Sequence, residues 1–371
     1  MTRAEYQLSA VVLRIIAWFA RLWPIRRRVV IATARLPRLE GNLAFLHAAI
    51  RRRYPSMPCI LLLEPYGYGL AARLAYLLRV ARGMWYVQTS RLVIVDNAYL
   101  PIHVARHRAG TVVVQVWHAV GALKRFGADT VIPLGEPEQT FLHRNYDLVV
   151  SAGEASREPY SRALRTPVSA VLGLGTPRTD FFFDPVALDL ARSRVLTRYP
   201  LLAGRRVVTY APTFRGRGKR RWSPLDLDAT TLRAALPDSD VLVVKHHPNL
   251  PLGRGPTAGF DVVIDPGEEM NDVLAATDVL ITDFSSSIFE FALLRRPMIL
   301  LVADLDEYER DPGLYVDYRS EMIGCMATNT GDVLRALLEP PRLDGYDAFI
   351  ARHLGACDGS ASDRIAERLL A

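Results

Sequence analysis

Short apolar segments alternate with longer mixed segments along most of the chain, and this alternation constrains the fold more than any other feature. The expected strands form two series, which are Cys59–Leu63, Leu92–Asp96, Val112–Trp117, Leu148–Ser151 and Ala170–Leu172, then Val207–Tyr210, Val241–Lys245, Val262–Ile264, Val279–Thr282 and Met298–Val302. Helix-like segments separate them, among them Gly69–Val80, Thr230–Leu236, Glu269–Ala275 and Ser287–Leu294. Because strands that alternate with helices form parallel sheets covered on both faces, the sequence predicts two doubly wound α/β domains in tandem.

The expected boundary between the domains lies near Phe183–Tyr199, where Asp184-Pro185 ends one unit and an arginine-rich helix begins the next. It divides the chain into an N-terminal helix at residues 1–28, a first Rossmann-like domain at 29–185 and a second at 186–371. A chain of 371 residues suits this division, since single cores rarely grow beyond about 250–300 residues.

An apolar segment from Leu8 to Trp23 resembles a signal peptide, but Arg14 and Arg21 interrupt it and no small-residue cleavage site follows. It also falls short of the ~20 clean apolar residues that cross a bilayer. Its apolar residues recur at helical spacing, and the basic run Arg26–Arg28 follows directly. Two interpretations stay open: a helix packed on the first domain, or an amphipathic helix in the membrane interface with its arginines on lipid phosphates.

Charge and cysteine content narrow the classes of partner. A net charge of +7 at pH 7 suits a nucleotide, a phosphorylated polymer or an anionic membrane. Basic and aromatic residues are not arranged as in nucleic-acid-binding surfaces, so no nucleic-acid partner is expected. The three cysteines lie far apart without a CxxC motif, which argues against a disulfide framework or a zinc site and fits a reducing compartment.

Several familiar signatures are absent from the sequence, namely the GxxxxGKS/T phosphate loop, GxGxxG, HExxH and GxSxG. Their absence argues against a P-loop nucleotidase, an ordinary dehydrogenase, a zincin and an α/β-hydrolase. Two DxD strings, Asp226–Asp228 and Asp304–Asp306, are too common by chance to predict a metal site, and no metal ligands are predicted. Since doubly wound sheets bind ligands at the carboxyl ends of their strands, polar residues that follow strands carry most of the functional information.

Histidines end two of the expected strands. His118 closes the segment Val114–His118 and is placed to act as a base beside an anionic group. The segment Val243–Pro248 ends in a lysine and two imidazoles, and because neighbouring side chains of a strand point opposite ways, only one of His246 and His247 need face a ligand. The alternative for His118 is a purely structural role. The alternative for His246 and His247 is a histidine pair on the protein surface.

Two further strand ends carry groups suited to phosphate. In Tyr210–Arg215 a hydroxyl (Thr213) and a guanidinium (Arg215) follow a strand. In the other, Ser285–Ser287 form a hydroxyl-rich turn at a helix N-terminus, where unpaired N–H groups and hydroxyls bind phosphate together. Glu290 follows one turn into that helix, on the side that a ribose would reach. The alternative for Tyr210–Arg215 is a simple loop without a ligand. The alternative for the serine turn is plain N-capping of the helix by one serine.

These four clusters, in this order and spacing, resemble the CDP-glycerol glycerophosphotransferase family of teichoic acid primases and polymerases. The resemblance covers roughly Val87 to Asn329. The matching elements are Gln115–His118 with Lys124, Gly175–Asp180, Tyr210–Arg215, His247-Pro248, Asp278–Glu290 running on to Arg296-Pro297, and Asp304–Tyr308.

The resemblance implies a GT-B fold of two Rossmann-like domains facing across a cleft, the first for the acceptor and the second for the donor nucleotide. It implies transfer of glycerol phosphate, or a related polyol phosphate, from CDP-glycerol or CDP-ribitol to a hydroxyl of a lipid-linked saccharide or polyol-phosphate acceptor. CMP is released, and the product is a teichoic-acid-like wall polymer. Such an enzyme is expected in the cytoplasm, peripheral on the anionic inner face of the cell membrane. No cofactor is implied, although a loosely held Mg²⁺ is compatible with the sequence.

Residue by residue, the resemblance implies catalytic roles for His118 and His247. His118 is the expected base for in-line attack of the acceptor hydroxyl on the donor's β-phosphorus. The expected donor-binding residues are Pro212, Thr213, Arg215, Thr282, Asp283, Ser285, Ser286, Ser287 and Glu290. Lys124 and Arg178 are expected on the acceptor or phosphate side.

The sequence departs from the family pattern at Ala119, usually glycine, before Tyr315, where Arg-Gly is usual, and near Ile323–Cys325, where Pro-Gly-Pro is missing. These departures leave the polyol and the acceptor open. A core of this length favours a primase-like or single-addition enzyme over a long-chain polymerase. Two other functions stay open: a GT-B glycosyltransferase that uses a nucleotide sugar such as a CMP-sugar for capsule or wall polysaccharide, and a non-enzymatic, membrane-surface polyanion-binding protein.

Overall fold

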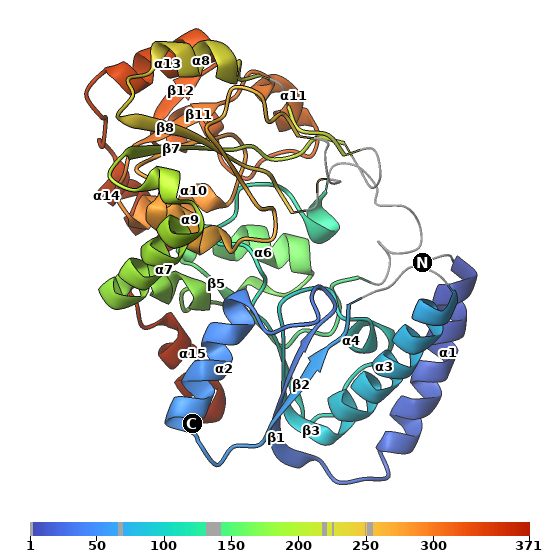
Figure 1. Ribbon diagram of the computed structural model, residues 1–371. Helices are drawn as coiled ribbons and strands as arrows, with labels where there is room; N and C mark the ends of the chain where they lie inside the picture. The colour runs from blue at the N-terminus through green and yellow to red at the C-terminus, as the bar shows by residue number, and fades with distance from the viewer. Residues whose placement is uncertain are drawn as a thin grey trace. The chain divides into compact units, whose positions relative to one another are not determined.

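The computed structural model describes residues 3–65, 70–130, 142–216, 221–224, 226–248, 250 and 255–371. The chain forms two compact units (Figure 1). Unit 1 comprises Met1–Asp180, Asp311–Gly313 and His353–Ala371, and unit 2 comprises Phe181–Arg310 and Leu314–Arg352. Each unit contains a six-stranded parallel sheet with helices, which confirms the predicted doubly wound α/β architecture.

The sheet of unit 1 has the strand order β2-β1-β3-β4-β5-β6. Its strands are β1 (Arg26–Thr33), β2 (Cys59–Leu63), β3 (Ser90–Val95), β4 (Val112–Gln115), β5 (Leu148–Ser151) and β6 (Val171–Gly173). Its helices are α1 (Arg3–Ala20), α2 (Gly41–Arg53), α3 (Leu70–Thr89), α4 (Leu100–Val104), η1 (Gly127–Asp129), η2 (Glu154–Ser156), α6 (Arg157–Leu164), η3 (Val168–Ala170) and α15 (Ala361–Leu370). The strand order reverses between β1 and β3, so the ligand-binding crevice of such a sheet is expected at the carboxyl ends of these two strands.

The sheet of unit 2 has the order β12-β11-β10-β7-β8-β9. Its strands are β7 (Arg206–Ala211), β8 (Asp240–Lys245), β9 (Val262–Ile264), β10 (Val279–Thr282), β11 (Met298–Leu301) and β12 (Cys325–Ala327). Its helices are α7 (Pro185–Arg198), η5 (Pro200–Leu202), α8 (Ala229–Ala235), α9 (Met270–Ala276), α10 (Ser287–Leu293), α11 (Leu305–Arg310), α12 (Tyr318–Glu321) and α13 (Thr330–Leu338), while η4 (Pro177–Phe183) and α14 (Tyr346–Leu354) cross a boundary between the units. Here the order reverses between β7 and β10, which places the expected crevice at their carboxyl ends.

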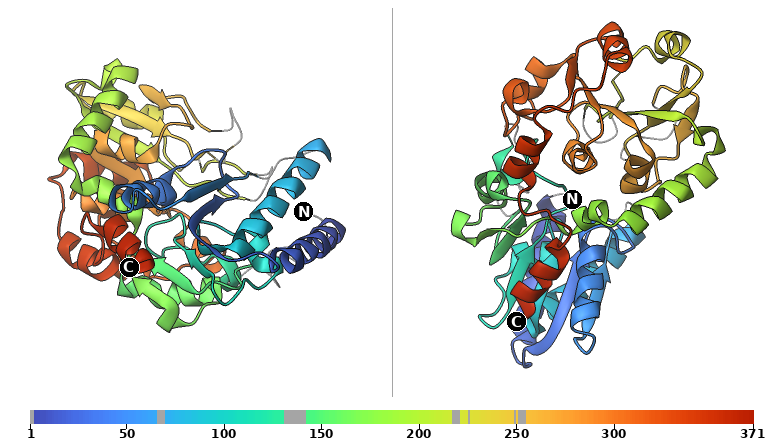
Figure 2. Two further views of the ribbon diagram at one scale, coloured as in Figure 1. Left: turned by 90° about the horizontal axis from the view of Figure 1, so that it is seen from below. Right: turned by 90° about the vertical axis from the view of Figure 1, so that its left-hand side faces the viewer.

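The C-terminal segment departs from the predicted division, which assigned residues 186–371 to one domain. Residues 353–371 return to unit 1, where α15 packs beside α2 (Figure 2). Ile365 and Ala366 are fully buried in the core of unit 1 together with Leu46 and Ile50 of α2. The Asp180 carboxylate accepts the N–H groups of Ala361 and Ser362 and so fixes the start of α15.

The N-terminal segment also departs from prediction. Residues 1–28 were expected to form one helix, but α1 ends at Ala20 and Arg26–Arg28 begin β1, a central strand of the sheet. Arg26 and Arg27 at the start of β1 are exposed, whereas Arg28 is half-buried and its guanidinium donates to Ser90 and Thr89. The apolar run that follows, Val29–Ala32, is completely buried. None of the helices in the described part of the chain is long and apolar enough to cross a membrane.

Candidate active site

The loops at the reversal point of unit 2 are tied together by Asp283, which follows β10. Its carboxylate accepts the N–H and the hydroxyl of Thr213, which follows β7, each at 2.9 Å. The Thr282 hydroxyl donates to the Ala211 carbonyl at 2.7 Å, and the Tyr318 hydroxyl donates to the Asp283 carbonyl. The structure therefore brings Thr213, Thr282 and Asp283, three of the predicted donor-binding residues, together at the carboxyl edge of the sheet.

Arg215 belongs to the same network. Its Nε and Nη2 donate to the two carboxylate oxygens of Asp304 at 2.6 and 3.0 Å, and its Nη1 lies 2.9 Å from Oδ2 of Asp283. The guanidinium also lies over the rings of Phe284 and Tyr308, 5.2 and 4.9 Å from their centroids. Arg215 was predicted to bind phosphate, but in this structure two carboxylates hold its guanidinium.

The serine turn lies between β10 and α10. The hydroxyls of Ser285 and Ser287 are 2.6 Å apart, and the Ser287 N–H donates to Oγ of Ser285 at 3.2 Å. Ser286 occupies the N-cap position of α10 without a capping bond from its side chain, so plain N-capping does not explain this residue. Ser285 and Ser286 are half-buried, whereas Glu290, expected to face a ribose, is only 3% exposed.

The two neighbouring histidines after β8, His246 and His247, lie in different surroundings. The ring of His246 is buried, and its Nε2 lies 3.0 Å from the carbonyl of Pro256. His247 is half-buried and packs edge-on against Phe214, in the loop after β7, at 4.9 Å between ring centroids. Lys245 is buried too, and its ammonium donates to the carbonyls of Asp265 and Pro266. Burial lowers the pKa of Lys245 to about 8.

These positions predict different effects for the two histidines. The resemblance predicts that His247 contacts the donor diphosphate. If it does, His247→Ala is expected to weaken donor binding about tenfold or more, because hydrogen bonds to charged groups contribute about 1.5–3 kcal/mol. His246→Ala is expected to lower the melting temperature, because it removes a buried ring, and to leave the donor dissociation constant close to wild type. Calorimetry with CDP and thermal unfolding of both variants make the comparison. A binding defect confined to His246→Ala would contradict this assignment.

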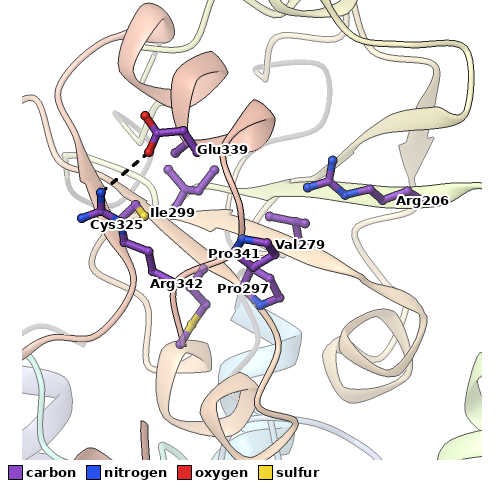
Figure 3. A pocket seen from close by; sticks show the side chains of 10 residues that line it. Arg206, Val279, Pro297, Ile299, Cys325, Glu339, Pro341 and Arg342 are labelled. Carbon is purple, nitrogen blue, oxygen red and sulfur yellow. Dashed lines mark ion pairs between the residues drawn. The ribbon is translucent and has the colours of Figure 1, made fainter. Parts of the chain in front are cut away.

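The amino ends of the strands in unit 2 carry a shallow hollow (Figure 3). Arg206 at the start of β7, Met298 at the start of β11 and Cys325 at the start of β12 line it, together with the Glu339–Arg342 ion pair. Because doubly wound sheets bind ligands at the opposite edge, this hollow is not the predicted site.

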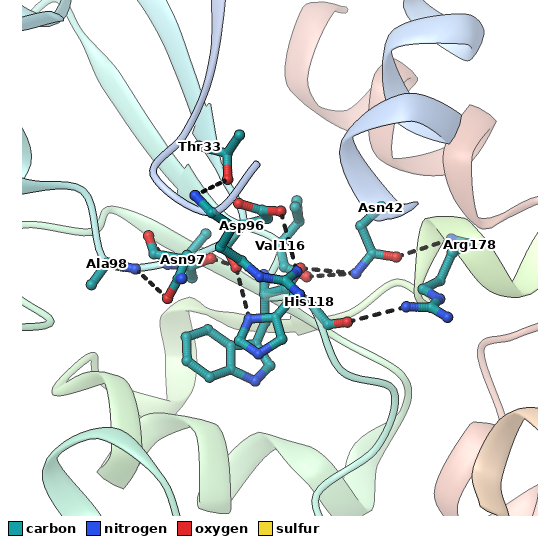
Figure 4. Close-up of polar contacts among 11 residues, drawn as sticks. Thr33, Asn42, Asp96, Asn97, Ala98, Val116, His118 and Arg178 are labelled. Carbon is teal, nitrogen blue, oxygen red and sulfur yellow. Dashed lines mark hydrogen bonds and ion pairs between the residues drawn. The ribbon is translucent and has the colours of Figure 1, made fainter. Parts of the chain in front are cut away.

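In unit 1, His118 lies just beyond β4 at the carboxyl edge of the sheet (Figure 4). Its Nδ1 is 3.2 Å from the backbone carbonyl of Asp96, which follows β3. A carbonyl only accepts hydrogen bonds, so Nδ1 of the neutral ring carries the proton and Nε2 keeps a lone pair. This tautomer suits a base that takes a proton at Nε2.

Burial lowers the pKa of His118 to about 3, and the positive charges of Arg35 and Arg178 act in the same direction. The imidazole is therefore neutral at pH 7. An imidazole that acts as a general base must be neutral, but it works best with a pKa near the operating pH, so the assignment of His118 as the base rests on its position and tautomer. Arg178, one of the residues predicted on the acceptor or phosphate side, lies with Nη1 3.5 Å from the carbonyl of His118. Lys124 is half-buried in the segment that follows.

Sequence reasoning missed two residues of these sites. Asn42, at the start of α2, donates through Nδ2 to the carbonyl of Trp117 at 2.9 Å and accepts the N–H of Arg178 at 3.0 Å. Asp304, the main partner of Arg215, appeared in a DxD string and in the family-like segment Asp304–Tyr308, but it was not among the predicted site residues. No local pattern predicts either contact, because the partners lie far away in the sequence.

Comparison with known proteins decides the family. The family described as CDP-Glycerol:Poly(glycerophosphate) glycerophosphotransferase matches residues 16–371, almost the whole chain. The chain belongs to this family. The resemblance inferred from the four strand-end clusters is thereby confirmed.

Two curated relatives of this glycerophosphotransferase-family chain come from Bacillus spizizenii. The teichoic acid ribitol-phosphate primase is 31% identical over 93% of this chain and 92% of its own length. The teichoic acid poly(ribitol-phosphate) polymerase is 31% identical over 94% of this chain, which spans only 57% of that relative's length. A solved structure of the wall teichoic acid polymerase TagF, soaked with CDPG, aligns with a TM-score of 0.76 at 19% identity, covering 97% of this chain and 93% of that one. This likeness confirms the expected fold of two Rossmann-like domains.

Proposed function

We propose that this protein transfers a polyol phosphate from a CDP-activated donor to an acceptor hydroxyl and releases CMP, in the synthesis of a teichoic-acid-like polymer. The observation that carries the proposal is the family match over residues 16–371, which includes all four strand-end clusters. Both named relatives are ribitol-phosphate enzymes, so CDP-ribitol is the first donor to test and CDP-glycerol the second. The acceptor is a hydroxyl of a lipid-linked saccharide or polyol phosphate.

In the proposed reaction the acceptor oxygen attacks the donor's β-phosphorus, and the bond from that phosphorus to the CMP oxygen breaks. The hydroxyl proton passes to Nε2 of His118, and CMP leaves as an anion. The serine turn and His247 of unit 2 stabilise the negative charge of the diphosphate and of the departing CMP. Arg215 and Asp283 hold the loops that carry these groups.

The test measures CMP release from CDP-ribitol and CDP-glycerol with a lipid-linked disaccharide acceptor. The proposal expects acceptor-dependent release of CMP from at least one of these donors, no release of UDP from UDP-sugars and no release of CMP from a CMP-sugar. Turnover of a nucleotide sugar alone would instead favour the glycosyltransferase alternative. Binding to anionic vesicles without any nucleotide affinity would favour the polyanion-binding alternative.

Ser286→Ala is expected to weaken donor binding by about 1.5–3 kcal/mol, roughly 10–100-fold, because it removes a hydroxyl offered to a charged phosphate. Its side chain makes no capping bond, so the melting temperature should change little. Ser320→Ala, in the short helix α12 of the same unit, is the matched control and should bind CDP as wild type does. Isothermal calorimetry with CDP measures both, and an unchanged affinity for Ser286→Ala would remove the serine turn from the site.

We also propose that α1 brings the protein to an anionic membrane surface. One side of α1 packs on α3 and α4 through Ala10, Leu13 and Ala17. The opposite side exposes large apolar side chains, namely Leu8, Val11, Ile15, Trp18 and Phe19, between 49% and 63% exposed. Both early interpretations of this segment are therefore compatible: the helix packs on unit 1 and still offers an apolar face, with arginines nearby, to lipid.

The sharpest test of this surface replaces side chains, because deleting residues up to Arg28 would remove the start of the central strand β1. A triple variant of Val11, Ile15 and Trp18 to serine is expected to lower partition onto phosphatidylglycerol vesicles at least about tenfold, since fully burying such a side chain contributes about 1.5–3 kcal/mol. Val186→Ser with Leu190→Ser, exposed apolar residues of α7, is the control. Equal vesicle binding by the triple variant and the control would contradict the proposal.

A further inference from the structure

The residue before His118 has an unusual backbone. Trp117 adopts φ +50°, in the left-handed region that bulky side chains rarely enter. Its ring stacks on that of Phe126 at 4.5 Å between centroids and lies tilted against that of His118 at 4.3 Å. Such a conformation persists only where the surrounding structure holds it, and it occurs preferentially at functional sites.

Two buried amide side chains hold the Trp117 backbone at both ends. The N–H of Trp117 donates to Oε1 of Gln115 at 2.8 Å. The carbonyl of Trp117 accepts from Nδ2 of Asn42 at 2.9 Å, and the same nitrogen lies 3.3 Å from the carbonyl of Val116. Gln115 is local to the turn, whereas Asn42 reaches it from the start of another element, α2.

Asn42 is only 2% exposed, and both polar atoms of its amide are used inside unit 1. Nδ2 fixes the turn that carries His118, and Oδ1 accepts the N–H of Arg178. The amide therefore joins three segments of unit 1: α2, the turn after β4, and residue 178. A side chain so occupied is not placed to bind substrate, but it contacts the turn that carries His118.

We propose that Asn42 is a positioning residue for the transfer reaction: its amide holds the Trp117 peptide and so fixes the His118 imidazole against the carbonyl of Asp96. The inference rests on the proposed function, in which His118 is the base. Without the Nδ2–H bond, the Trp117 peptide relaxes from its left-handed conformation and the next residue turns with it. A displacement of about 1 Å in a catalytic group costs on the order of 10²-fold in rate.

The test compares Asn42→Ala with Asn42→Asp. An aspartate keeps the shape and still accepts the Arg178 N–H, but its carboxylate cannot donate to the Trp117 carbonyl. Both variants are expected to lose about 10–100-fold in kcat, with the donor KM within about twofold of wild type. Histidine ¹⁵N NMR gives a second readout: the single Nδ1-protonated form of His118 should be lost in both variants.

Gln88→Ala is the matched control. Gln88 is a fully buried amide that donates to the carbonyl of Arg106 at 3.2 Å, and it precedes the amino end of β3, at the edge of the sheet away from His118. This variant is expected to lose stability but to keep the wild-type kcat and the wild-type His118 spectrum.

Wild-type kcat and an unchanged His118 spectrum in Asn42→Ala would overturn the inference, as would wild-type behaviour of Asn42→Asp. If Asn42→Ala does not fold, the isosteric Asn42→Asp tests the inference through the same two measurements, kcat and the His118 spectrum. A wild-type protein that releases no CMP contradicts the proposed function instead, and the His118 spectrum then decides the inference about Asn42 without any assay of activity.

Discussion

Replacing His118 by alanine is expected to lower turnover by about 10²–10⁴-fold, the usual contribution of a general base, while the donor dissociation constant stays near wild type. The bond from Nδ1 to the Asp96 carbonyl leaves Nε2 with the lone pair that accepts the proton in the proposed reaction. Because the imidazole is neutral at pH 7, its loss removes no positive charge from the donor phosphates. The change should therefore appear in the chemical step.

Single-turnover rates and calorimetry separate these two effects. His107→Ala is the matched control, since His107 is a buried histidine of unit 1 whose Nε2 pairs with Asp147 at 2.8 Å, just before β5 begins. That variant should lose stability but keep its rate per folded molecule. Near-wild-type turnover of His118→Ala would remove this residue as the base.

Replacing Arg215 by alanine is expected to lower the free energy of unfolding by about 3–5 kcal/mol. The guanidinium is buried between the carboxylates of Asp283 and Asp304, so its loss leaves two negative charges close together without their cation. It also removes the contacts with the Phe284 and Tyr308 rings. Chemical denaturation of the purified variant measures the loss.

Arg319→Ala is the control for this experiment, because Arg319 also pairs with two carboxylates of unit 2, Asp306 and Glu309, but is 52% exposed. Solvent screens such pairs, so a much smaller loss of stability is expected. Equal and small losses in both variants would show that the Arg215 network contributes little to folding. The guanidinium would then be available to a phosphate, as the sequence first suggested.

Most strands were predictable because buried strands of a parallel sheet consist mainly of β-branched residues and leucine. Val241–Val244 is a continuous run of valine and leucine, typical of a strand buried on both faces, and β8 occupies Asp240–Lys245. β1 was missed because Arg26–Arg28 look like the basic end of a helix, although the strand begins with them. The return of α15 to unit 1 depends on packing against α2, which leaves no local pattern.

The meeting of strand-end residues was predictable for a related reason: polar residues after strands lie at one edge of a parallel sheet, as Thr213 and Asp283 do. The partners of individual side chains were not predictable. Arg215 and Asp304 are 89 residues apart, and Asn42 and Trp117 are 75 residues apart. Only the fold brings these pairs within hydrogen-bonding distance.

The central claim is transfer of a polyol phosphate, and mass spectrometry of the acceptor tests it most directly. A lipid-linked disaccharide is incubated with the full chain and either CDP-ribitol or CDP-glycerol. The account predicts that the acceptor gains the mass of one or more units of ribitol phosphate or glycerol phosphate, with an equal amount of CMP. CMP release without any gain of mass by the acceptor, or a sugar gained from a nucleotide sugar in place of a polyol phosphate, would contradict it.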